Sequence, residues 1–205
     1  MNERPLAIDL FCGLFGWSEG LIQEGWRTVG FDIENMHAKF GLQRPPHCQL
    51  VIQDVLTLHG SQFKDAALIV ASPPCQGYSY RAMPWKRAKA LPPPDNSLFD
   101  ACFRIQREAC EAAGRHIPMI VENVRGAQKW VGPARWNSGA FYFWGDIPAL
   151  MPIFRAIKCG GDWFEPGVKS EMRKLSSRSP ARKMASAMIA KIPLPLSQHI
   201  ARTFL

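Results

Sequence analysis

Short runs of apolar residues alternate with amphipathic segments through the first two thirds of the chain. Apolar stretches rich in β-branched residues predict strands that are covered on both faces, and the segments between them have helical spacing. Strands are expected at residues 6–11, 28–33, 49–55, 67–72 and 118–124, and helices at residues 16–25, 35–43 and 97–114. This order predicts an α/β fold with a mostly parallel sheet and helices on both faces.

Two later segments interrupt this pattern. Residues 73–96 are rich in proline and cannot form regular structure for long. The helix that follows has Ser97 as its predicted N-cap and Gly114 as its predicted stop. Beyond about residue 145 the periodicity weakens, and the final 25 residues indicate a helix, a Pro-Leu-Pro break and a second short helix.

Composition and charge narrow the class of protein. The chain is 47% hydrophobic and 20% charged, as folded globular proteins are. Its formal net charge is +8, and residues 155–205 hold 10 Lys and Arg against 3 Asp and Glu. A second basic cluster lies within the proline-rich stretch. Clustered positive charge favours a polyanion such as DNA or RNA, although a solvated basic surface would have the same composition.

Cysteine usage and hydropathy predict a cytoplasmic protein without metal. The six cysteines include no CxxC pair and no zinc-ligand spacing, so free thiols in a reducing compartment are expected. No apolar run reaches the roughly 18 residues of a membrane span. The start of the sequence has no apolar stretch long enough for a signal peptide.

Candidate ligand-binding residues follow the first three predicted strands. Gly13 and Gly16 lie in the first strand–helix turn, where glycines let the backbone pass close to a ligand. Asp32 ends the second strand and could bind ribose hydroxyls, and Asp54 ends the third, where it suits an adenine amino group. No lysine follows the glycines, as a phosphate-binding loop would require. The pattern therefore favours an adenosyl ligand without phosphates, although a plain tight turn also uses glycines.

A second group of residues follows the fourth and fifth predicted strands. Pro73 and Pro74 stiffen the backbone before Cys75, whose thiolate would be a good nucleophile. Glu122 ends an apolar strand, where desolvation would raise its pKa and let it hydrogen-bond N3 of a pyrimidine. The next residue, Asn123, could hold the loop backbone. A packing cysteine and a solvated glutamate are the plain alternatives.

These motifs together resemble one family. DLFCG, an acid after the second strand, PPCQGYS and ENV, in this order, are similar to the DNA cytosine-5 methyltransferases over roughly residues 5–145. The resemblance implies a Rossmann-like S-adenosylmethionine-dependent methyltransferase fold in a monomer that acts on double-stranded DNA. It also implies three parts: a catalytic, cofactor-binding domain at 1–150, a short basic insert at 151–185 and a C-terminal segment at 186–205 that returns to the catalytic domain.

The resemblance implies a role for each matching residue. Cys75 would add to C6 of a flipped-out cytosine, and Glu122 would protonate or hydrogen-bond N3, so that C5 accepts the methyl group. Arg135 is the candidate for an arginine that reaches the cytosine. Cofactor contacts are expected from Phe11, Gly13, Gly16, Asp32, Ile33, Asp54, Val55, Pro73 and Leu98. Further substrate contacts are expected from Pro74, Gln76, Ser79, Asn123, Arg81, Lys86 and Arg87.

The chain departs from the family pattern in three places. Phe15 stands where the family usually has a glycine in its cofactor turn. The family's Gln-x-Arg-x-Arg segment is absent, and Arg135 is the nearest substitute. The region that usually holds a large target-recognition domain is short, so a small form of the family with a short or relaxed target sequence is expected. Its basic residues are expected to contact phosphates without reading sequence: Arg173, Lys174, Arg178, Arg182 and Lys183.

Two other functions remain open from the sequence. Related proteins with the same core act on tRNA, so an RNA cytosine-5 methyltransferase is one alternative. A nucleic-acid-binding module that has lost catalysis is the other, and Phe15 and the missing arginine segment favour it. The intact PPCQ and ENV motifs argue against a silent module, which has no need of an exposed thiol facing a carboxyl group.

Overall fold

The computed structural model describes residues 4–79, 86, 90–152, 175–176 and 178–205 of the chain. Of the residues predicted to bind substrate or phosphate, Arg81, Arg87, Arg173 and Lys174 lie outside the described residues. Lys86 is described and is exposed.

Seven strands form one sheet in the order β3-β2-β1-β4-β5-β7-β6. The strands are β1 (Leu6–Leu10), β2 (Arg27–Asp32), β3 (Cys48–Ile52), β4 (Leu68–Ala71), β5 (Met119–Asn123), β6 (Trp136–Ser138) and β7 (Phe141–Gly145). The first five pair in parallel, whereas β6 and β7 form an antiparallel hairpin whose β7 pairs with β5. This arrangement confirms the predicted α/β, Rossmann-like methyltransferase fold. The strand order reverses at β1, and such a reversal opens a ligand crevice at the carboxyl ends of the strands.

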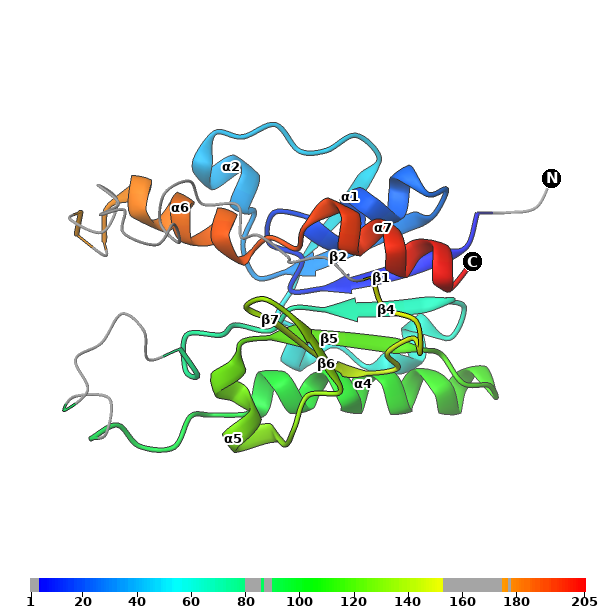
Figure 1. The fold of residues 1–205 in the computed structure, drawn as a ribbon. Helices are drawn as coiled ribbons and strands as arrows, with labels where there is room; N and C mark the ends of the chain where they lie inside the picture. Colours follow the sequence, from blue (N-terminus) through cyan, green and yellow to red (C-terminus); the bar gives the residue numbers. More distant parts are fainter. Residues whose placement is uncertain (1–3, 80–85, 87–89, 153–174, 177) are drawn as a thin grey trace.

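Helices cover both faces of the sheet (Figure 1). They are α1 (Gly16–Gln23), α2 (Met36–Phe40), α4 (Ser97–Ala113), α5 (Gln128–Val131), α6 (Pro180–Ala190) and α7 (Leu194–Thr203), with 3₁₀ turns η1 (Val55–Thr57), η2 (Gly60–Phe63) and η3 (Arg125–Ala127). The helices α1 and α7 pack together on one face, and α4 lies on the other. The predicted pair of helices after the last basic segment is therefore confirmed.

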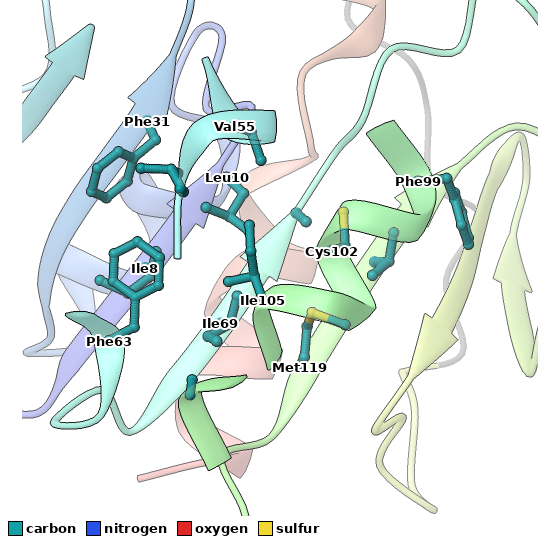
Figure 2. Packing of buried hydrophobic residues seen from close by; sticks show 14 of the residues in the cluster. Ile8, Leu10, Phe31, Val55, Phe63, Ile69, Phe99, Cys102, Ile105 and Met119 are labelled. Carbon is teal, nitrogen blue, oxygen red and sulfur yellow. The ribbon is translucent and has the colours of Figure 1, made fainter. Parts of the chain in front are cut away.

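Each face of the sheet has its own hydrophobic core. On the α4 side, Phe99 and Ile105 pack toward Ile69 and Met119 of the central strands (Figure 2). On the opposite side, a second cluster joins Trp17 and Leu21 of the first helix, and Trp26 after it, to the last helix. Burial on both faces explains why the central strands are continuous apolar runs rather than alternating ones.

The last helix is fixed to the first by close backbone approach. A Cβ at Gly20 would lie 2.5 Å from Oγ of Ser197, so only glycine fits there. Ser197 donates a hydrogen bond to the carbonyl of Trp17, and Trp26 Nε1 donates one to the carbonyl of Ala201 at 3.1 Å. The segment after the basic region thus covers the helix that follows the glycine turn.

The predicted element limits need three corrections. Ser97 is the first residue of α4 rather than its N-cap, because Asp95 accepts its backbone N–H at 2.8 Å. The third strand ends at Ile52, and Asp54 instead caps η1 by accepting from the backbone N–H of Leu56. The strand β6 was not predicted, because three residues are too few to show a period.

Candidate active site

The turn between β1 and α1 holds unusual backbone conformations. Phe11 and Phe15 both have positive φ angles, 58° and 57°, in the left-handed region that glycine favours. The Phe15 side chain is completely buried and packs with Cys12 and Cys48 beneath the turn. A Cβ at Gly30 on β2 would lie 2.6 Å from the Phe15 ring. Gly30 therefore makes room for the phenylalanine that replaces the family's glycine.

Two carboxyl groups occupy the backbone amides of this turn. Asp32 accepts from the backbone N–H of Gly13 at 2.9 Å and from that of Glu34 at 3.1 Å. Asp9 is fully buried beneath the turn and accepts from the backbone N–H and hydroxyl of Ser18, at 3.2 and 2.7 Å. A pyrophosphate would need such amides for itself, and it would be repelled by carboxylates. The turn therefore suits a ligand without phosphate.

Burial raises the pKa of both carboxyl groups. Desolvation raises the pKa of Asp9 to about 7, although the hydrogen bonds from Ser18 oppose the shift. Burial also raises the pKa of Asp32, against the hydrogen bonds from the turn. The second oxygen of Asp9, Oδ1, is buried and has no hydrogen-bond partner among the described residues. A positively charged ligand near this turn would favour the ionised carboxylates.

The predicted adenine contacts lie at the ends of β2 and β3. The Ile33 side chain directly after β2 is 72% exposed, which is unusual for a large apolar residue. Asp54 keeps one carboxylate oxygen free of its capping bond to Leu56. Val55, in contrast, is buried in the core on the α4 side, so only its backbone faces outward for a ligand.

The Cys75 loop leaves β4 and is held at both ends. Asn123 on β5 donates its side-chain N–H to the carbonyl of Pro73 at 2.9 Å. The carbonyl of Cys75 accepts from the backbone N–H groups of Tyr78 and Ser79, at 3.0 and 2.9 Å. The Tyr78 hydroxyl donates to Oδ1 of Asn96 at 2.9 Å, just before α4. Cys75 itself is half-buried, between the exposed side chains of Pro74 and Gln76.

Glu122 lies one strand away, on β5, which pairs in parallel with β4. It is 7% exposed and stands opposite Phe143 of β7. Side chains alternate along a strand, so Glu122 faces the same side as Ile120, toward the α1 core. On that side, Ser72 at the end of β4 accepts a hydrogen bond from Trp17 Nε1 at 3.0 Å. The cysteine and the glutamate thus lie at the same edge of adjacent strands.

The arginine predicted to reach the cytosine does not lie next to the ends of β4 and β5. Arg135 is exposed beside β6, the outermost strand of the sheet, and its backbone N–H donates to the carbonyl of Phe143 at 2.8 Å. Its side chain borders a hollow of about 370 Å³ with Trp136 and residues 147–149 and 151. None of the other residues predicted for the site lines this hollow. The predicted contact with the base stays a prediction.

Other expected features concern thiols, metals and membranes. Five of the cysteines are described, and none of these five is in a disulfide, as predicted: Cys12, Cys48, Cys75, Cys102 and Cys110. Among the described residues, no three His, Cys, Asp or Glu side chains gather where they could hold a metal ion. Of the described helices, none has both the length and the apolar character that a bilayer span requires.

Three residues at the site were missed from the sequence. Asp9 lies inside a buried strand, and the signal that could have revealed it was an acid within an otherwise apolar run. Tyr78 and Asn96 meet across the proline-rich stretch, a pairing that no local pattern encodes.

Comparisons with known proteins agree with this geometry. The model of the C-5 cytosine-specific DNA methylase family matches residues 6–130. The Type II methyltransferase M.XorII of Xanthomonas oryzae pv. oryzae is 32% identical over 85 residues, which are 37% of this chain and 20% of that protein. Among solved structures, a DNA modification methyltransferase encoded within an E. coli prophage is 24% identical with a TM-score of 0.43, over 62% of this chain and 35% of that one.

The S. pombe Dnmt2 methyltransferase is 17% identical with a TM-score of 0.41, over 63% of this chain and 37% of that chain. The chain thus spans a fifth of the length of the curated relative it matches and about a third of these two structures. The family model, in contrast, covers more than half of the chain and includes the glycine turn, the Cys75 loop and Glu122. This chain therefore belongs to the C-5 cytosine-specific DNA methylase family.

Proposed function

We propose that this chain transfers a methyl group from S-adenosylmethionine to C5 of cytosine in double-stranded DNA. Its membership of the family supports the reaction. The observation that carries it is the fixing of the Cys75 loop to β5, beside the buried Glu122, through the bond from Asn123 to Pro73. A nucleophile and a carboxyl group held at one edge are what addition to a pyrimidine ring requires.

The residues of the glycine turn fit S-adenosylmethionine. Asp32 accepts the backbone N–H of Gly13 on one oxygen and that of Glu34 on the other, so it retains capacity for ribose hydroxyls. The exposed Ile33 side chain offers an apolar surface for adenine, and the spare oxygen of Asp54 suits its amino group. The carboxyl groups of Asp9 and Asp32 favour a cationic ligand over a phosphate. When bound, the cofactor would supply an electrophilic methyl group on its sulfonium sulfur.

In the proposed reaction, the thiolate sulfur of Cys75 forms a bond to C6 of the cytosine. The electron pair that this addition displaces moves toward C5, while Glu122 delivers a proton to N3 and limits the charge on the ring. The cofactor would supply the methyl group that C5 takes, with the electron pair of the broken carbon–sulfur bond staying on its sulfur. Loss of the C5 proton to a base restores the C5–C6 double bond and expels the Cys75 thiolate. The proton on N3 returns to Glu122, so the enzyme is regenerated.

The target base must leave the duplex for this chemistry, because C6 is inaccessible in a stacked helix. Figure 1 shows α6 at the end of the sheet to which β4 points, the same end as the start of α4. Arg178 and Lys183 of that region are exposed. Basic side chains at this end of the sheet, where Cys75 and Glu122 lie, would bind phosphates without reading bases. A short or relaxed target sequence follows from this proposal.

The test replaces the nucleophile. The Cys75→Ser variant is expected to lower transfer of labelled methyl groups to unmethylated duplex DNA by about 10³-fold or more, with cofactor affinity unchanged. Cys110→Ser is the matched control, since that thiol lies on α4 and, within the described part of the chain, its hydrogen bonds go to the backbone of Ile117. DNA containing 5-fluorocytosine should form a stable covalent adduct with the native chain and not with Cys75→Ser, because fluorine at C5 cannot leave as a proton.

Three results would overturn the proposal. Transfer to tRNA with none to DNA would make the chain an RNA methyltransferase. Cofactor binding with no transfer to either would make it a silent binding module. Full activity of Cys75→Ser would exclude the covalent route. Bisulfite sequencing of the product would give the target, and a strict site of five or six bases would contradict relaxed recognition.

A further inference from the structure

Two segments lie side by side at the exit of the central strands. At one end, Asn123 binds the carbonyl of Pro73 at 2.9 Å. At the other end, Gly126 lies against Tyr78 so closely that a Cβ on the glycine would be 2.2 Å from the tyrosine carbonyl oxygen. The two segments between these contacts, 73–78 and 123–126, are therefore neighbours. Arg125 belongs to one of them and Cys75 to the other.

Arg125 is exposed and begins the turn η3. Within the described part of the chain, its guanidinium makes no hydrogen bond or ion pair. Some of the other described arginines differ in this respect. Arg104 binds Glu108 and two carbonyls, Arg115 binds the carbonyl of Ala66, and Arg202 binds Glu24. Those arginines are used within the fold, whereas Arg125 remains available to a ligand.

The next cation along this helical turn is already engaged. Lys129, four residues after Arg125, lies over the ring of Trp130 with its nitrogen 4.5 Å from the ring centroid. A cation–π contact of this kind holds the lysine against its own helix. Of the two cations on the described turn η3 and helix α5, the one that no group of the fold engages is therefore Arg125.

Arg135, the arginine favoured from the sequence, is less well placed. It borders β6, which is two strands beyond β5 in the sheet order. Neighbouring strands are about 4.8 Å apart, so the backbone of Arg135 lies roughly 10 Å from β5 across the sheet, on the side away from β4. The hollow that it lines is formed with Trp136 and the segment after β7 rather than with the Cys75 loop.

We propose that Arg125 binds a backbone phosphate of the nucleotide whose base faces Cys75. The inference rests on the proposed methyl transfer to DNA. A base in reach of the cysteine brings its own phosphates to the rim of the same loop, and a guanidinium binds phosphate through two parallel hydrogen bonds. Such a contact orients the flipped nucleotide without reading its sequence. Arg125 is then a DNA-binding residue of the reacting edge, and Arg135 is not needed there.

The experiment measures how salt weakens binding to a mixed-sequence duplex of about 20 base pairs. For Arg125→Ala, the slope of log association constant against log salt concentration should fall in magnitude by about one unit, with binding weakened roughly tenfold at low salt. Arg125→Lys keeps the positive charge and should largely restore the slope. Arg107→Ala is the matched control, because this exposed arginine lies on α4, about 15 Å along the helix from its start, and should leave the slope unchanged.

Several outcomes would overturn the inference. A native slope in Arg125→Ala, or an equal loss in Arg107→Ala, would show that no phosphate is bound by Arg125 in particular. A shift in the pH profile of Cys75 alkylation by iodoacetamide, with the slope unchanged, would show that the arginine acts on the thiol instead. Failure of the methylation proposal is separable, since the native chain would then transfer no methyl group to DNA whatever the salt slopes of its variants.

Discussion

The carboxyl ends of the parallel strands form two halves of the candidate site, and these halves are built in opposite ways. In the half formed by β1 and β2, the carboxyl groups are bound to nearby groups of the fold, as the buried Asp9 is to Ser18 and the half-buried Asp32 to Gly13. In the half formed by β4 and β5, Glu122 is buried and Cys75 is half-buried, whereas other side chains of this half are exposed. There the side chain of Asn123 is fully buried, while Gln76 and Arg125 are exposed.

This difference follows from what each half is proposed to hold. A small cationic cofactor is recognised by carboxyl groups fixed in advance, because ordering them on binding would cost conformational entropy. A flipped nucleotide arrives on a large polyanion and needs exposed groups that can reach it. The first half should therefore respond to mutation mainly through folding and cofactor affinity, and the second half mainly through catalysis and DNA binding.

The largest effect expected in the first half is a pH dependence of stability that comes from Asp9. Its pKa is about 7 in the fold against 3.8 for an unperturbed aspartate, so between these values the folded chain binds more protons than the unfolded chain. The free energy of unfolding should consequently fall as pH rises through this window, by up to about 4 kcal/mol. Asp9→Asn does not titrate, so its stability relative to the native chain should rise from pH 4 to pH 8 in urea unfolding.

Asp95 in the second half provides the control for this prediction. The backbone N–H of Ser97 lowers the pKa of Asp95, so its contribution is present above the unfolded pKa and disappears as pH falls. Asp95→Asn should therefore show the opposite and smaller trend. If the free energies of unfolding of Asp9→Asn and the native chain change with pH in parallel, burial does not destabilise the ionised form of Asp9. The contrast between the two halves would then not hold for this residue.

The next effect concerns packing around the turn. A Cβ at Gly16 would lie 2.5 Å from the backbone nitrogen of Ile192, so Gly16→Ala must push α1 away from the C-terminal segment. Overpacking of this kind should lower the free energy of unfolding by about 2–3 kcal/mol and weaken cofactor binding. Gly77→Ala in the Cys75 loop is the matched change, since its Cβ would meet only the Pro94 side chain, at 3.3 Å. Thermal unfolding that places both variants at the same midpoint would contradict the contrast.

The smallest effect tests the support of the Cys75 loop. Tyr78→Phe removes the hydroxyl that binds Asn96 and should cost about 1 kcal/mol, or about fivefold in kcat, with cofactor affinity unchanged. Asn96→Ala should have a similar effect, and the double variant should lose little more than either single one. Additive losses would show that the two residues act separately, and a loss confined to cofactor affinity would assign Tyr78 to the other half.

Local patterns were sufficient for the five parallel strands and the main helices. The five parallel strands are apolar runs with turn residues on either side, and Cys75 and Glu122 lie in short, specific sequence motifs. What could not be predicted depends on the register between strands. That Gly30 makes room for Phe15 follows only once β1 and β2 are paired, because the two residues are fifteen positions apart.

The placement of the arginines shows the same limit. Arg125 and Arg135 are ten residues apart in a basic chain, and nothing in their local sequence tells which one lies beside the cysteine. The distinction comes from the contact between Gly126 and Tyr78 and from the hairpin that carries Arg135 to the sheet edge. Contacts between residues far apart in sequence determine where both arginines lie, whereas propensity and periodicity reflect only residues close in sequence.

The packing of α7 on α1 bears on how the molecule is made. The bond from Trp26 to Ala201 spans 175 residues, so the helix beside the glycine turn stays uncovered on the ribosome until the last helix emerges. Trp17 of this helix, and Trp26 just after it, would then be exposed for many seconds at ordinary rates of synthesis. Closing so long a loop is also slow, because chain entropy is lost before contacts compensate for it. Chaperones should accordingly bind the exposed α1 of nascent chains until α7 has been synthesised and packs on it.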